Sequence, residues 1–197
     1  MICRMKDGVT YEEAIQAVEA HVRNFFSGHP IDSTRYDLGT GRREALPGFR
    51  ILTAGPGSRV DGWTYVTAGC WGAVNDDGHG REFILSAPVR DESFAELLAM
   101  VAYYHLSHRL DLEHGMPIGR PWVPGSACDH LLICLPYLHG PGLEHCPVPT
   151  GHARLLWTLP VTTAEMEFRR EHGHEALEDR FDQAGIVPTD PHRPSVV

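Results

Sequence analysis

The chain has 197 residues, of which 42% are hydrophobic and 22% charged, a composition that is typical of a folded globular protein and excludes a disordered or collagen-like chain. Its formal net charge is −9, and the excess lies in residues 61–197, which carry 19 acidic and 9 basic side chains. Because such a field repels phosphate backbones, the charge argues against nucleic-acid binding and favours a basic partner.

The sequence predicts neither a membrane segment nor a secretory signal. No apolar run reaches the roughly 20 residues that span a bilayer, and the N-terminal stretch lacks an apolar core of roughly 7–15 residues. The cysteines are odd in number and scattered, with no C-x-x-C pair, which favours reduced thiols in a cytoplasmic protein. They are Cys3, Cys70, Cys128, Cys134 and Cys146.

The N-terminal half predicts one helix followed by strands. Thr10 and Glu13 form a capping-box pattern before apolar residues at helical spacing, so we expect a helix over residues 10–27. Residues 28–48 are rich in Gly, Asp and Arg and predict a loop. The turn "VNDDGHG" then predicts a β-hairpin, or two neighbouring antiparallel strands, within residues 62–89. The expected strands are residues 49–55, 62–71 and 81–89.

A long helix is the next predicted element. Ser93 and Glu96 form a second capping-box pattern, and Gly115 stands just past the expected end of the helix. The helix is expected over residues 92–115. It is followed by a loop rich in Pro and Gly over 116–130, a continuous apolar run over 131–138 that predicts a buried strand, and a second loop over 139–153.

The segment "LLWTLPVTTAEMEF" predicts a strand that leads into a helix. The strand is expected to start at Arg154 and to stop at Pro160, while Thr162 and Glu165 form a third capping-box pattern. A second short helix is expected over residues 174–185, and the prolines of the tail prevent its continuation.

A metal site is the first catalytic alternative. His105 and His108 lie at i and i+3 on one helix face, where both could bind one ion, with His114, Cys128 or His130 completing the ligand set. However, the pair lacks the i, i+4 spacing and the adjacent glutamate of H-E-x-x-H, so the motif supplies no general base.

Other catalytic motifs are incomplete. Cys128 and His130 lack a third, orienting group, and there is no G-x-S-x-G elbow to activate Ser126. The glycine-rich segments 39–44 and 55–59 do not continue into a phosphate-binding pattern. The sequence therefore predicts no catalytic residue, no metal and no cofactor.

The order of several signatures along the chain resembles the Suppressor-of-fused domain family. They are "WTYVTAGCW", "GREFILSAP", "ELLAMVAYYH", "PGSACDHLLICLPYL", "LLWTLPVTTAEMEF" and the tail "DPHRPSVV". The resemblance covers roughly residues 45–197 and is to the single-domain bacterial members of the family. Leu159, Pro160 and Glu165 match the family as structural residues.

The resemblance implies a fold and a role. The fold is a single α/β (α+β) domain over residues 45–197, with a central mixed, largely antiparallel β-sheet flanked by helices and residues 1–44 packed on it as an N-terminal helix and loop. The role is that of a non-enzymatic protein-binding module, and in bacterial members that of an immunity protein neutralising a toxin. Two alternatives stay open: a metal-dependent hydrolase using the His105/His108 pair, and a structural scaffold subunit.

The predicted partner-binding surface lies on the hairpin. Acidic side chains in the turn speed the encounter with a basic protein, and aromatic anchors on the flanking strands hold it. An extended segment of the partner can also add to an edge strand of the sheet. The predicted binding residues are Trp63, Tyr65, Trp71, Asp76 and Asp77.

Overall fold

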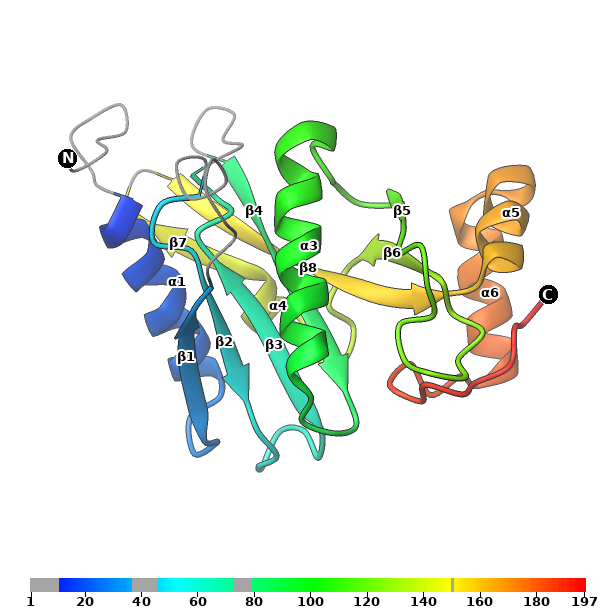
Figure 1. The fold of residues 1–197 in the computed structure, drawn as a ribbon, viewed down its shortest axis with the longest axis horizontal. Helices are drawn as coiled ribbons and strands as arrows, with labels where there is room; N and C mark the ends of the chain where they lie inside the picture. Colours follow the sequence, from blue (N-terminus) through cyan, green and yellow to red (C-terminus); the bar gives the residue numbers. More distant parts are fainter. Residues whose placement is uncertain (1–10, 37–45, 73–78, 150) are drawn as a thin grey trace. The chain divides into compact units, whose positions relative to one another are not determined.

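The computed structural model describes residues 11–36, 46–72, 79–149 and 151–197 (Figure 1). By their contacts, these residues form two compact units. The first unit combines the chain up to Leu110 with Leu135–Trp157, and the second combines Asp111–Cys134 with Thr158–Val197.

The first unit is built on a mixed sheet with the strand order β1-β2-β3-β4-β8, and β7 also pairs with β8. Neighbouring strands are antiparallel, except that β4 and β8 are parallel. The strands are β1 (Ile31–Arg35), β2 (Arg50–Ala54), β3 (Trp63–Ala68), β4 (His79–Ala87), β7 (His145–Val148) and β8 (Gly151–Val161). The predicted α+β fold with a mixed, largely antiparallel sheet is confirmed, and so is the antiparallel pairing of β3 and β4.

Helix α1 (Tyr11–Phe25) covers one face of this sheet. Arg50 on β2 forms ion pairs with Glu12 (2.7 Å) and Glu19 (3.0 Å) of the helix. The predicted apolar stripe is confirmed, because its residues Ala14, Ile15, Val18 and Val22 are buried. The expected cap Thr10 lies outside the described residues.

Helix α3 (Glu92–His108) covers the opposite face. The ring of Phe94 lies 5.8 Å from that of Tyr65 on β3, and Tyr65 and Arg50 belong to opposite faces of the sheet because strand side chains alternate. Figure 1 shows α3 in front of β3 and β4, with β1 and β2 beside it rather than under it.

The helix begins at Glu92 as expected, but its predicted capping box and its predicted end are wrong. The N-cap is Asp91, whose carboxylate accepts a hydrogen bond from the Ser93 N–H (2.8 Å), so the Ser93–Glu96 capping box does not form. The helix stops at His108 because Arg109 adopts a left-handed conformation (φ 49°), well before Gly115. Asp is as good an N-cap as Ser, and the residue that precedes the first turn takes the position.

Two predicted loops contain regular structure. Residues 28–48 contain β1, and residues 139–153 contain the short helix α4 (Pro141–Glu144), β7 and the start of β8. Strand β1 was missed because four of its five residues are polar and exposed, so no alternation of apolar and polar residues marks it.

Strand β8 continues through Pro160, where the sequence predicted its end. Proline fits in a strand at a position where its missing N–H is not needed by the ladder. Its carbonyl group is used: it accepts a hydrogen bond from Nη2 of Arg193 (2.9 Å).

The second unit contains the end of β8 together with β6 (His130–Cys134) and β5 (Gly115–Pro117), in the order β8-β6-β5. The two helices predicted for the C-terminal segment are present as α5 (Thr163–His172) and α6 (His174–Ala184), and they pack against each other. The capping box of α5 is confirmed: Glu165 N–H donates to Thr162 Oγ1 (3.1 Å), and Thr162 N–H donates to the Glu165 carboxylate (2.8 Å).

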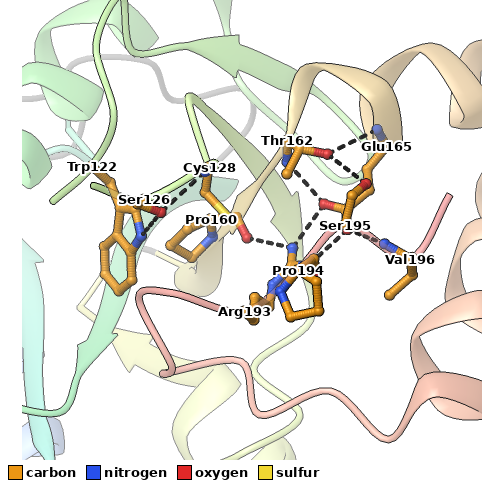
Figure 2. Close-up of polar contacts among 10 residues, drawn as sticks. All are labelled: Trp122, Ser126, Cys128, Pro160, Thr162, Glu165, Arg193, Pro194, Ser195 and Val196. Atoms are coloured by element: carbon orange, nitrogen blue, oxygen red, sulfur yellow. Dashed lines mark hydrogen bonds and ion pairs between the residues drawn. The ribbon is translucent and has the colours of Figure 1, made fainter. Parts of the chain in front are cut away.

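The same carboxylate also holds the C-terminal tail (Figure 2). Arg193 binds both oxygens of Glu165 (2.6 and 2.8 Å), with 3% and 0% of the two residues exposed. Val196 N–H donates to Oε1 of Glu165 (3.1 Å), and the Ser195 hydroxyl lies 3.1 Å from that of Thr162. Burial alone would lower the pKa of Arg193, but Glu165 raises it, so the guanidinium stays charged. This buried ion pair therefore joins the tail to β8 and to the first turn of α5.

Breaking this ion pair from one side should be costly. We expect Arg193→Met to lower the free energy of unfolding by about 3–5 kcal/mol, because it leaves a buried carboxylate without a cation. The double variant Arg193→Met/Glu165→Gln should lose less than the sum of the two single variants. Urea denaturation of the four proteins measures this coupling, and additive losses would show that the pair does not act as a unit.

Candidate functional site

A pocket of about 220 Å³ lies on the α3-covered face of the first unit, where β1 and β2 extend beyond the helix. Thr34 comes from β1, and Tyr65 from β3 forms part of the wall. Asp91 and Glu92 contribute from the start of α3. The full lining is Thr34, Tyr36, Ile51, Thr53, Tyr65, Arg90, Asp91, Glu92 and Ala95.

Strand register explains why these side chains meet. Thr34 lies opposite Ile51, and Thr53 lies opposite Tyr65, so the four occupy one face of three adjacent strands. The Tyr65 hydroxyl donates to the Asp91 carbonyl (3.0 Å) and accepts from the Asp91 N–H (3.0 Å). Tyr65 thus fixes the first turn of α3 at the edge of the pocket.

Arg90 ties the rim of the pocket together. Its Nη2 lies 2.8 Å from the carboxylate of Asp32 on β1, and its guanidinium lies 5.2 Å from the centre of the Trp63 ring. Each contact is partly exposed, so each contributes little to stability. Because of these two contacts, the guanidinium of Arg90 already has partners within the protein.

The pocket carries a negative potential. Burial raises the pKa of Tyr36, and the charges of Glu96 and Glu92 raise it further. The pKa of Asp91 is lowered by its hydrogen bonds with Ser93, which keeps this carboxylate ionised. These groups favour a positively charged ligand.

The structure separates the predicted binding residues. Trp63 and Tyr65 share one face of β3 at the pocket, where Trp63 is partly exposed and Tyr65 is 2% exposed. Trp71 is 1% exposed, and its Nε1–H donates to the carbonyl of His152 (2.9 Å), so its side chain belongs to the core. Asp76 and Asp77 lie outside the described residues.

The backbone around Trp71 is held by a second buried carboxylate, Glu82. Its Oε1 accepts hydrogen bonds from the N–H groups of Gly69 and Trp71 (both 2.9 Å), and its Oε2 accepts from the Thr67 hydroxyl (2.5 Å). The side chain is fully buried, and burial raises its pKa against the effect of these hydrogen bonds. Glu82 therefore serves the fold of the segment that follows β3.

The raised pKa of Glu82 predicts a pH dependence of stability. The unfolded chain loses this proton near pH 4.5, below the pKa in the folded protein. Wild-type protein should therefore lose stability relative to Glu82→Gln as the pH rises from 4.5 through the folded pKa, and the difference should then stay constant. Denaturation of both proteins from pH 4 to pH 8 measures it, and a difference that is independent of pH would contradict the assignment.

The hydrolase alternative receives no support. His105 is 1% exposed and packs edge-on against Phe83, whereas His108 is exposed and stacks on Tyr104. The two imidazoles therefore face different environments and do not converge on one ion. No group of three or more His, Cys, Asp or Glu side chains within the described residues is placed to hold a metal.

Two other groups singled out in the sequence have structural partners. The hydroxyl of Ser126 accepts hydrogen bonds from Trp122 Nε1–H and from Cys128 N–H (both 3.1 Å), which fixes the loop before β6 (Figure 2). His130 Nδ1 lies 2.9 Å from Asp129, whose pKa is lowered by hydrogen bonds with His130 and Thr163 despite partial burial. Neither arrangement contains a nucleophile with a base.

The cysteines of the described residues are free and buried. Burial raises the pKa of each thiol, to about 12 for Cys146, so the reactive thiolate is scarce at neutral pH. The four residues are Cys70, Cys128, Cys134 and Cys146.

This burial predicts a clear result in thiol titration. At pH 7.5, at most one thiol of the native protein should react promptly, because only Cys3 lies outside the described residues. Denatured, unreduced protein should show all five thiols. A count of three or one would reveal disulfides and contradict the cytoplasmic prediction.

Sequence reasoning missed most of the pocket. Thr34 and Tyr36 fall in or beside a polar segment without a motif, Thr53 lies in a predicted strand that carried no functional signal, and Arg90 is an isolated charge between a strand and a helix. Of the residues predicted to bind a partner, Tyr65 lines the pocket and Trp63 contacts its rim through Arg90.

Comparison with known proteins identifies related folds. The family described as Suppressor of fused protein (SUFU) matches residues 46–194. The crystal structure of a protein described as a SUFU homologue from Neisseria gonorrhoeae is 34% identical, with a TM-score of 0.81 over 94% of this chain and 98% of that one. A search of curated proteins gave no match.

Two more distant structures share the fold. The crystal structure of the Sufu–Fu complex is 15% identical, with a TM-score of 0.68 over 93% of this chain and 92% of that chain. Drosophila Suppressor of Fused is 14% identical, with a TM-score of 0.62, and this chain spans about half of it, 51%. No helix within the described residues is long and apolar enough to cross a membrane.

Proposed function

The chain belongs to the Suppressor of fused family, and we propose that it acts by binding other proteins without catalysing a reaction. The observation that carries this proposal is the first unit's sheet, which among the described residues ends at strand β1, beside a pocket lined by Asp91 and Glu92. The Sufu–Fu complex, a likeness in fold, shows a relative bound to a protein.

Strand β1 offers backbone groups to a partner. Gly55 N–H donates to the Pro30 carbonyl (2.9 Å), and Tyr36 N–H donates to the Phe49 carbonyl (3.2 Å). Alternation along an antiparallel pair turns the backbone groups of Ser33 and Arg35, which lie between the bonded positions, away from β2. An extended segment can hydrogen-bond to those groups and continue the sheet.

At the finer level, we propose that the partner is a basic toxin and that this protein is its cytoplasmic immunity protein. The net charge of −9 and the negative pocket favour a cationic partner. The buried, free thiols suit a reducing compartment. The alternative role is that of a scaffold subunit. The two roles differ in the partner, since a scaffold subunit would bind a protein that is not toxic.

Coexpression with the products of neighbouring genes tests this function. We expect one product to arrest growth alone, to be tolerated together with this protein, and to copurify with it as a stoichiometric complex. A stable complex with a harmless product would favour the scaffold role. Hydrolysis of a substrate by the isolated protein, abolished by removing a single side chain, would overturn the non-enzymatic proposal.

Charge reversal in the hairpin turn should affect the rate of association with that partner. We expect Asp76→Lys/Asp77→Lys to slow association and to weaken its salt dependence, because rim charges act mainly on the on-rate. The control Glu167→Lys/Glu171→Lys makes the same charge change on exposed positions of α5. Surface-binding kinetics at low and high salt measure both, and equal effects of the two variants would show that only net charge matters.

A further inference from the structure

We propose that the pocket beside β1 receives an arginine or lysine side chain from an extended segment of the partner that pairs with β1. This inference rests on the proposed binding function and names the chemistry that the site recognises. Four observations carry it: the edge strand, the reach that the pocket requires, the surrounding charges, and the commitment of nearby hydrogen-bond donors.

The position of the pocket selects a long side chain. An added strand would lie about 4.8 Å from β1, whereas the pocket is walled by Thr34 of β1, Ile51 and Thr53 of β2, and Tyr65 of β3. A residue paired opposite Thr34 would project its side chain onto this face of the sheet. It must then cross β1 to reach the pocket, which lysine and arginine can do with their apolar stems against Thr34, an exposed residue of β1.

The charges and rings of the pocket select a cation. Asp91 and Glu92 line it, and Glu96 is close enough to act on Tyr36. The ring of Tyr36, which is partly exposed in the pocket lining, belongs to the class of groups on which guanidinium and ammonium groups are stabilised. The single arginine in the lining, Arg90, is neutralised by Asp32 and does not cancel the three carboxylates.

An anion is disfavoured because three N–H groups at the start of α3 already have partners. The pocket lies at the start of α3, where free N–H groups would attract a negative charge. Here Ser93 N–H donates to the Asp91 carboxylate (2.8 Å) and Phe94 N–H to the Asp91 carbonyl (3.3 Å). Asp91 N–H in turn donates to the Tyr65 hydroxyl. These three N–H groups are therefore taken by Asp91 and Tyr65.

A short synthetic peptide tests the pocket without the natural partner. The probe is acetyl-Thr-Val-Thr-Arg-Thr-Val-Thr-amide, compared with the same peptide carrying neutral citrulline in place of arginine. Binding to the full chain is followed by NMR through the amide signals of Ser33 and Arg35 and the side chain of Tyr36. We expect the arginine peptide to bind about tenfold more tightly, since removing the charge removes the cation–π and carboxylate contacts.

Three variants locate the effect. Glu92→Gln/Glu96→Gln should weaken binding of the arginine peptide by about threefold or more and leave binding of the citrulline peptide unchanged, because Glu92 lines the pocket and the charge of Glu96 acts on Tyr36. The control Glu167→Gln/Glu171→Gln removes two exposed charges from α5 and should change neither peptide. Ser33→Pro should abolish binding of both peptides, since it removes an outward N–H from the edge strand while sparing the bonds to β2.

The outcomes distinguish this inference from the proposed function. Equal affinity of the two peptides, signal changes away from β1, or no binding at millimolar concentration would each overturn the pocket assignment. If the protein still forms a stoichiometric complex with its partner in those cases, the binding function stands and only the pocket assignment fails. If the peptides behave as expected but no partner is found, the pocket stands and the proposed toxin does not.

Discussion

A carboxylate without exposed surface must find its compensation inside the protein, and in the second unit the organisation of three segments depends on how Glu165 does so. Fully buried, it accepts two hydrogen bonds from Arg193 and others from Thr162 and Val196. Because Thr162 follows β8, Glu165 lies in the first turn of α5, and Arg193 and Val196 belong to the tail, these three segments have to meet at one point. The desolvation cost of the pair makes any partial arrangement unfavourable.

The first unit also contains a buried carboxylate, that of Glu82, whose described hydrogen-bond partners include no cation. Glu82 is compensated by backbone N–H groups and the Thr67 hydroxyl, which hold the chain between β3 and Trp71 in one conformation. Towards the other end of β3, the Tyr65 hydroxyl forms two hydrogen bonds with the backbone of Asp91 and so holds the first turn of α3 in place. As a result, α3 lies over β3 and β4, and the pocket lies beside the first turn of α3, next to β1 and β2.

This arrangement suits binding better than catalysis. The histidines, serines and thiols that attracted attention in the sequence are stacked, hydrogen-bonded or buried, and none of them forms a nucleophile with its base. By contrast, the pocket combines tyrosine rings, threonine hydroxyls and carboxylates next to a sheet edge whose outward backbone groups alternate with those bonded to β2. These features are the basis of the proposal that the protein binds an extended, basic segment of another protein.

The sequence by itself determined the elements whose signals are local. The α1 stripe, the antiparallel β3–β4 pairing and the Thr162–Glu165 capping box follow from periodicity and short spacings, and the family resemblance supplied the fold class. Only the tertiary structure decided the rest. Strand β1 exists because β2 pairs with it, β8 passes through Pro160 where the chain needs no donor, and Trp71 is core because of its neighbours. The pocket likewise depends on the register across three strands and on the placement of α3. Contacts between residues that are distant in the chain leave no periodic pattern in the sequence, so these features could not be predicted from it.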